Sequence, residues 1–185
     1  IYNEDLVRQS YRSLIRSGLF ESVEIEATDL KEKPGEITLN IKVEEKPRFS
    51  ISAIVGYGSW EQLRGGLAVE NINVFGTGHR VRLEGRGSLK GEHAGAEYLN
   101  PFFFNEYVSQ DAMAYFERRE QRSYTSQDIG GETGFGFRIT EKLRSRAFYK
   151  LRESELLEVD EVLPTALTQD VLLSSMNLVT SFDTR

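Results

Sequence analysis

The sequence predicts a mainly β protein that carries a small α+β unit at its N-terminus. Three observations support this fold class. From residue 49 onward, apolar and polar residues alternate in successive runs, which is the period of β-strands. Helical spacing of apolar residues is confined to residues 6–15. Of the 16 glycines, two precede residue 50 and fourteen fall between Gly56 and Gly136, so the composition changes where the alternation begins.

The N-terminal unit is predicted to contain one helix and two strands. Asn3 is a favourable N-cap residue, Glu4 and Asp5 suit a helix N-terminus, and Gly18 suits the position after a helix C-terminus. Alternation predicts strands at residues 22–27 and 37–44, joined by a turn at Lys33-Pro34-Gly35. Such a unit is small for an independent core, so we expect the front of this domain to be missing. Lys46-Pro47 is the expected domain boundary.

Beyond this boundary we expect about eight strands, most long enough to span a bilayer when tilted. Short connections are predicted at residues 76–78 and 89–92, a strand end at Asn100-Pro101, and a longer loop from Leu156 to Asp170. The predicted strands occupy residues 49–57, 63–70, 81–88, 94–98, 111–116, 129–139, 146–152 and 176–183.

One face of these strands gathers charge. Its members are Arg64, Glu70, Arg82, Glu84, Arg86, Glu132 and Arg138. Such a face would be costly in the dry core of a soluble sandwich, but it can line a water-filled lumen. A half-solvated sheet also has one apolar and one charged face, so the pattern alone leaves membrane barrel and soluble sandwich open.

Composition narrows the function classes. The 185 residues carry 23 basic and 29 acidic side chains, a net charge of −6. This argues against a dedicated nucleic-acid binder, which would carry a basic face. Cysteine is absent, which excludes disulfides, a thiol nucleophile and a Cys-based zinc site. No apolar run approaches the roughly 20 residues that a membrane-spanning helix needs. The chain opens with Ile1-Tyr2-Asn3, so we expect a signal peptide to be absent, removed or encoded upstream.

Several motifs carry a resemblance to a known family. Tyr11, Leu14, Gly18-Leu19-Phe20, Val23-Glu24-Ile25 and residues 41–45 resemble the last part of a POTRA (polypeptide-transport-associated) domain. Gly56-Tyr57-Gly58, Leu63-Arg64-Gly65-Gly66, the Asn-x-x-x-Phe-Gly-x-Gly run at residues 71–78, residues 98–102 and residues 182–185 resemble the outer-membrane protein assembly factor superfamily, the BamA/TamA-like proteins. The resemblance implies the end of a POTRA domain at residues 1–46 and about half of a 16-stranded antiparallel transmembrane β-barrel at residues 47–185. The family's arginine-bearing lumen loop is not in this sequence.

The resemblance also implies a function. Family members insert β-barrel proteins into the outer membrane, with the POTRA part in the periplasm. Their first barrel strand forms a lateral gate that pairs with client strands, and a POTRA edge strand receives clients. Here the edge strand would be Val23, Glu24, Ile25 and Glu26. The gate strand would be Phe49, Ser50, Ile51, Ser52, Ala53, Ile54, Val55, Gly56, Tyr57 and Gly58.

The expected partners are unfolded outer-membrane β-barrel proteins and outer-membrane lipid, together with accessory lipoproteins or periplasmic chaperones, and no nucleic acid. We expect no cofactor, no metal and no catalytic activity, because no catalytic constellation is present. His79 and His93, the two histidines, are expected to be solvated turn residues. Phe102, Phe103 and Phe104 fit either an interfacial aromatic girdle or an ordinary strand-end cluster. Two alternatives stay open: a secretion pore of the two-partner type, and a soluble all-β binding module.

Overall fold

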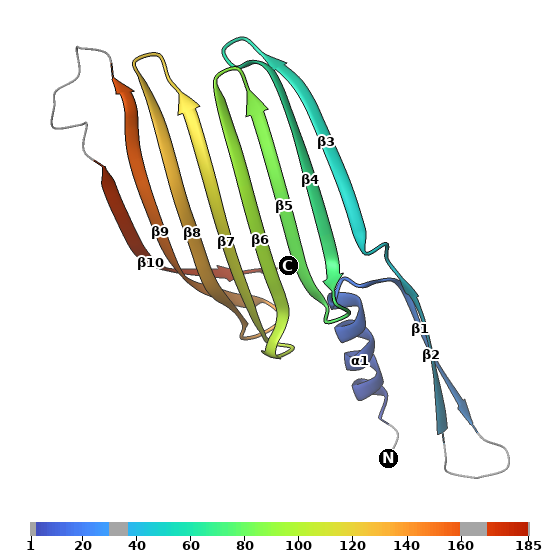
Figure 1. The fold of residues 1–185 in the computed structure, drawn as a ribbon. Helices are drawn as coiled ribbons and strands as arrows, with labels where there is room; N and C mark the ends of the chain where they lie inside the picture. The colour runs from blue at the N-terminus through green and yellow to red at the C-terminus, as the bar shows by residue number, and fades with distance from the viewer. Residues whose placement is uncertain (1–2, 30–36, 160–169, 185) are drawn as a thin grey trace.

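The computed structural model describes residues 3–29, 37–159 and 170–184, which form one helix and two antiparallel sheets (Figure 1). The N-terminal unit consists of helix α1 (Glu4–Arg16) and the paired strands β1 (Phe20–Asp29) and β2 (Ile37–Glu45). The larger sheet contains β3 (Phe49–Gly58), β4 (Gln62–Val74), β5 (His79–Ser88), β6 (Gly91–Asn105), β7 (Val108–Glu120), β8 (Tyr124–Arg138), β9 (Leu143–Val159) and β10 (Val171–Phe182). Within these residues no helix is long and apolar enough to cross a membrane.

Helix α1 begins and ends where its sequence predicts. The Asn3 side chain accepts a hydrogen bond from the Asp5 N–H at 2.8 Å, and Glu4 and Asp5 lie in the first turn. These groups satisfy and complement the free N–H groups of a helix start. Gly18 follows the helix with a φ of +72°, a conformation that glycine adopts without a steric penalty.

The larger sheet is a simple meander in which every strand pairs with its neighbours in sequence. Its order runs from β3 at one edge to β10 at the other, and all pairs are antiparallel. The turns after β4, β6 and β8 therefore lie at one end of the sheet. Helix α1 lies beside that end, which we call the helix end, and the turns after β3, β5 and β7 lie at the far end (Figure 1).

The two faces of this sheet differ in chemistry, as the alternation predicts. Directly opposed residues share a face, and one such row contains Glu70, Arg82, Glu97, Met113, Glu132 and Lys150. A row on the other side contains Ile51, Val69, Leu83, Ala96, Ala114, Gly131 and Leu151. We call these sides the polar face and the apolar face.

No second protein layer covers the apolar face in the described part of the chain. Phe135, Phe137 and Ile139 are 37%, 40% and 59% exposed, and no large side chain is fully buried. A soluble sandwich would bury these side chains between two sheets. The exposed apolar face instead suits contact with acyl chains, so the described residues do not support the soluble sandwich.

Several sequence-based boundaries were wrong, and β8 and β10 each begin five residues earlier than predicted, at Tyr124 and Val171. Strand β6 does not end at Asn100-Pro101 but continues to Asn105, because the ladder absorbs the proline at a register irregularity between Asn100 and Asn105. Strand β9 runs to Val159, into the segment expected to be a loop from Leu156. The connection after β5 is confined to Leu89 and Lys90. The turn predicted at residues 33–35 lies outside the described residues.

Candidate functional site

All ten residues predicted to form a gate strand lie in β3, at the edge of the larger sheet. On one side β3 pairs with β4 from Phe49↔Asn71 to Gly58↔Gln62. Its other side has no strand partner among the described residues. An unpaired strand edge presents a row of backbone N–H and C=O groups that can accept another strand.

Strand β3 is held to the sheet by its backbone ladder and not by charge. It contains no charged residue, whereas edge strands are usually protected by charges. Its polar-face residue Ser50 opposes Glu70, but Glu70 pairs instead with Arg80 on β5, at 3.3 Å. At Gly56 the Arg64 side chain from β4 crosses the strand, and a Cβ there would lie 2.9 Å from Arg64 Nε. No ion pair in the described part of the chain joins β3 to β4.

Elsewhere on the polar face, ion pairs link several strands. Arg146 on β9 donates to Asp111 on β7 and, at 2.5 Å, to Glu132 on β8, while its guanidinium lies 4.4 Å from the Phe148 ring centroid. These contacts join β7, β8 and β9 across the polar face. In β7, β8 and β9, side-chain ion pairs therefore add to the backbone ladder, whereas in the described part of the chain β3 has only the ladder.

A second cluster on the polar face surrounds Glu84. Its carboxylate contacts Arg82, Arg86 and His93, each at 3.1 Å. The prediction that His93 is a solvated turn residue was wrong, because His93 lies within β6 and reaches the carboxylate of the neighbouring strand. It was wrong for His79 too, which begins β5 and contacts the Tyr98 hydroxyl at 3.1 Å. No group of three or more potential metal ligands occurs among the described residues.

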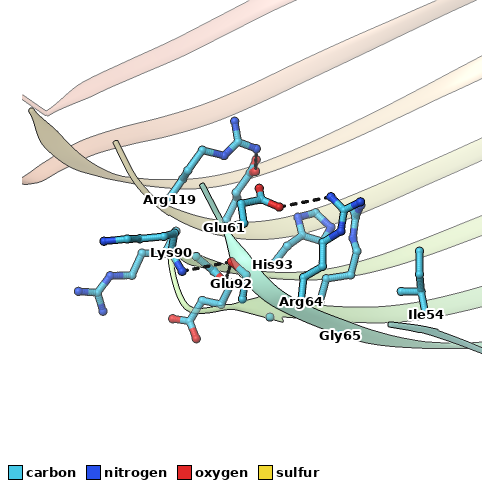
Figure 2. Close-up of a pocket in the computed structure, with 14 residues that line it drawn as sticks. Ile54, Glu61, Arg64, Gly65, Lys90, Glu92, His93 and Arg119 are labelled. Atoms are coloured by element: carbon cyan, nitrogen blue, oxygen red, sulfur yellow. Dashed lines mark hydrogen bonds and ion pairs between the residues drawn. The ribbon is translucent and has the colours of Figure 1, made fainter. Parts of the chain in front are cut away.

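A hollow of about 530 Å³ opens on this face toward the far end of the sheet. Figure 2 shows its lining, which includes Arg64, Lys90, His93 and Arg119. Acidic neighbours offset this charge: Arg64 pairs with Glu61 at 3.3 Å, and Lys90 pairs with Glu120. The hollow is therefore lined by charges of both signs, several of which are paired.

Helix α1 contacts two turns at the helix end of the sheet. Glu106, in the turn after β6, accepts hydrogen bonds from Ser13 Oγ at 2.6 Å and Gln9 Nε2 at 3.0 Å. Glu141, in the turn after β8, lies 2.8 Å from Arg12 Nη1 and 3.4 Å from Arg16 Nη2. These contacts hold the helix against the rim, and sequence reasoning did not find them.

The electrostatics of Glu106 follow from this contact. The hydrogen bonds from Ser13 and Gln9, together with the nearby positive charge of Arg138, hold the pKa of the Glu106 carboxyl below its usual value. These interactions favour the charged carboxylate. The contact between the helix and this turn is therefore strongest when Glu106 is ionised.

The predicted POTRA edge residues lie in β1, which pairs only with β2 among the described residues. Val23 opposes Val43 and is buried, and Ile25 opposes Ile41. Glu24 and Glu26 are exposed. The four residues therefore lie on a strand whose second edge has no partner among the described residues. They precede β3 by more than 20 residues in sequence.

Comparisons with known proteins agree on one family. Residues 73–185 match the model of the Omp85 superfamily domain. The outer membrane protein assembly factor BamA of Neorickettsia risticii (strain Illinois) is 22% identical over 170 residues, which are 90% of this chain and 23% of that protein. The crystal structure of BamA from Haemophilus ducreyi lacking POTRA domains 1–3 superposes with a TM-score of 0.68 at 19% identity, over 94% of this chain and 37% of that one. The chain thus spans about a quarter of the curated relative and just over a third of the solved chain.

Proposed function

The chain belongs to the Omp85 superfamily, and from this premise we propose that it is part of a machine that inserts β-barrel proteins into the outer membrane. Residues 1–46 form the end of a POTRA domain on the periplasmic side, and residues 47–185 form the first strands of the transmembrane barrel. The apolar face meets lipid and the polar face lines an aqueous lumen. The helix end of the sheet is then the periplasmic end.

The observation that carries this proposal is the uncharged strand β3, with one edge that has no partner among the described residues. In the complete barrel this edge meets the last strand, and the pair opens laterally. A strand of an unfolded client then adds to β3 through backbone hydrogen bonds. No cofactor is needed, because hydrogen bonding and apolar burial drive the insertion.

The contacts of helix α1 support coupling between the two parts. The contacts of Glu106 and Glu141 with the helix support a POTRA unit that is oriented below the lumen. Strand β1, with its edge at residues 23–26, is then the surface that first receives an extended client segment. Client strands would pass from one sheet edge to another, using the same backbone chemistry at each.

The test uses the full-length protein in liposomes together with a urea-denatured β-barrel client. The protein should accelerate client folding, and a disulfide from Ala53→Cys to the last barrel strand should abolish that acceleration until reductant is added. A matched control places the disulfide within the hairpin, between Ala53→Cys and Leu67→Cys, which are directly opposed. This control should retain activity. Equal activity of the two locked proteins would reject lateral opening, and a protein that exports one client without accelerating barrel folding would support a secretion pore instead.

A further inference from the structure

The turn between β4 and β5 exposes Phe75 almost completely, at 97% of its surface. Phe75 and Gly76 are the two central residues of the β-turn formed by residues 74–77 within this connection, and both have positive φ, +53° and +76°. Hydrogen bonds fix this geometry: Thr77 N–H donates to Val74 C=O at 3.1 Å, and Gly78 N–H donates to Asn73 Oδ1 at 2.8 Å. Hydrogen bonds therefore close the turn, and its phenylalanine makes little contact with the described residues.

This combination is unfavourable for the protein alone. Hairpin turns with positive φ at both central positions favour Asn-Gly, because asparagine tolerates the left-handed region. A bulky aromatic residue at the first position is strained. Phe75 recovers little of that strain through contacts with the described residues, and a contact outside the chain would account for an aromatic residue at this position.

Other exposed apolar side chains occupy the same end of the sheet. They are Phe49 at the start of β3, Phe104 near the end of β6, Ile139 after β8 and Phe182 at the end of β10. By register, Phe49 and Phe182 lie on the apolar face at the helix end. Aromatic residues at this height along membrane strands occupy the boundary between acyl chains and headgroups.

We infer that Phe75 anchors the β4–β5 turn in the lipid interface of the leaflet on the helix side. The occupant is phospholipid, because the turn lies at the end of the sheet where the exposed aromatic residues Phe49 and Phe182 of the apolar face also lie, and it follows β4, the partner of the proposed gate strand. The anchor would fix the height of that strand end in the bilayer while the neighbouring β3 exchanges partners. The inference rests on the proposed membrane setting of the sheet.

A photoreactive benzophenone amino acid at position 75 of the full-length protein, in native membranes, tests this contact. We expect adducts with lipid at position 75 and at Leu67, which lies on the apolar face, but none at Ile54, an exposed residue of the polar face. Adducts with protein at position 75, or no adduct there, would overturn the anchor while Leu67 still reports lipid. Loss of lipid adducts at Leu67 as well would overturn the membrane setting on which both proposals rest.

A pair of substitutions separates anchoring from turn preference. Turn preference alone predicts that Phe75→Asn raises the urea midpoint for unfolding from lipid vesicles, because asparagine relieves the strained φ. The anchor predicts the opposite: Phe75→Asn lowers the midpoint, whereas Phe75→Trp, which keeps an interfacial aromatic ring, preserves it. A midpoint for Phe75→Asn at or above that of the unchanged protein would refute the anchor.

Discussion

Two adjacent residues of β4 test which face of the sheet meets lipid. Leu67 lies on the apolar face, is 62% exposed and opposes Ala53 and Gly85, whereas Ala68 lies on the polar face and opposes Glu84. Arginine at each position adds the same charge at nearly the same height. We predict that Leu67→Arg destabilises the inserted protein strongly and that Ala68→Arg changes its stability little.

The expected size follows from the position of Leu67 along the strand. Strand β4 has 13 residues. At about 3.3 Å per residue and a tilt of about 40°, such a strand spans roughly 30 Å of membrane thickness. Leu67 lies near its middle, where an arginine on the lipid face costs about 2–4 kcal/mol. Since each 1.4 kcal/mol or so is tenfold, the unfolding equilibrium should shift by about 30-fold to 700-fold. At Ala68 the new cation stays hydrated beside Glu84, so the change should stay within about 1 kcal/mol.

Equilibrium unfolding of the full-length protein from lipid vesicles in a urea titration measures both variants. The difference between the two free energies of unfolding is the informative quantity, because it cancels effects of arginine on expression and on the unfolded chain. Equal destabilisation at both positions would mean that the two faces meet the same medium. A larger cost at Ala68 than at Leu67 would mean that the assignment of the faces is reversed.

Three further predictions concern the two ends of the sheet. Because the pKa of Glu106 is lowered, its contribution to the docking of α1 is present above the ordinary carboxyl pKa and is lost as pH falls through the lowered value. Hydrogen exchange of the helix should therefore rise in that acidic range. The Glu106→Gln variant should lose this pH dependence. Arg12→Glu should weaken docking of the helix, and adding Glu141→Arg in the double variant should restore it, as measured by spin-label distances between helix and barrel. High salt should abolish the difference between the single and the double variant. The ring centroid of Trp60, in the turn after β3, lies 5.5 Å from Lys90 Nζ and 5.4 Å from Arg122 Cζ. Trp60→Ala should therefore increase hydrogen exchange at the far end of β3 and β4, whereas Trp60→Phe should keep most of the protection.

The strands were predictable because the two faces of the sheet differ in chemistry along most of each strand. Alternation along a strand records that difference directly, so all eight strands of the larger sheet were found from the sequence. Their ends were harder to predict. Pro101 suggests a strand end because it lacks an N–H, but the Asn100 side chain accepts the Phe102 N–H at 3.1 Å and the strand continues through an irregular pairing.

The contacts between the helix and the rim were not predictable from the sequence. Ser13 and Glu106 are 93 residues apart, and Arg12 and Glu141 are 129 apart, so no local periodicity connects them. Glu106 and Glu141 also lie in short turns, where an acidic residue most simply indicates solvent exposure. What brings them to the helix is strand length and sheet order, which place alternate turns at the same end.

The distribution of charge within the sheet also bears on how the barrel is completed. Arg82 and Arg86 both pair with Glu84 along one strand, and Arg146 joins its partners across β7, β8 and β9. The polar face can therefore form before a lumen is enclosed, since much of its charge is paired within these strands.

The two edge strands differ from the rest, because neither β3 nor β10 contains a charged residue. Uncharged edges are aggregation-prone when left open, so their chemistry favours continued strand addition at both sides of the sheet. Paired charges on the polar face and two uncharged edge strands fit the proposed barrel that closes and reopens at β3, because opening there would break backbone hydrogen bonds and separate no ion pair on that strand.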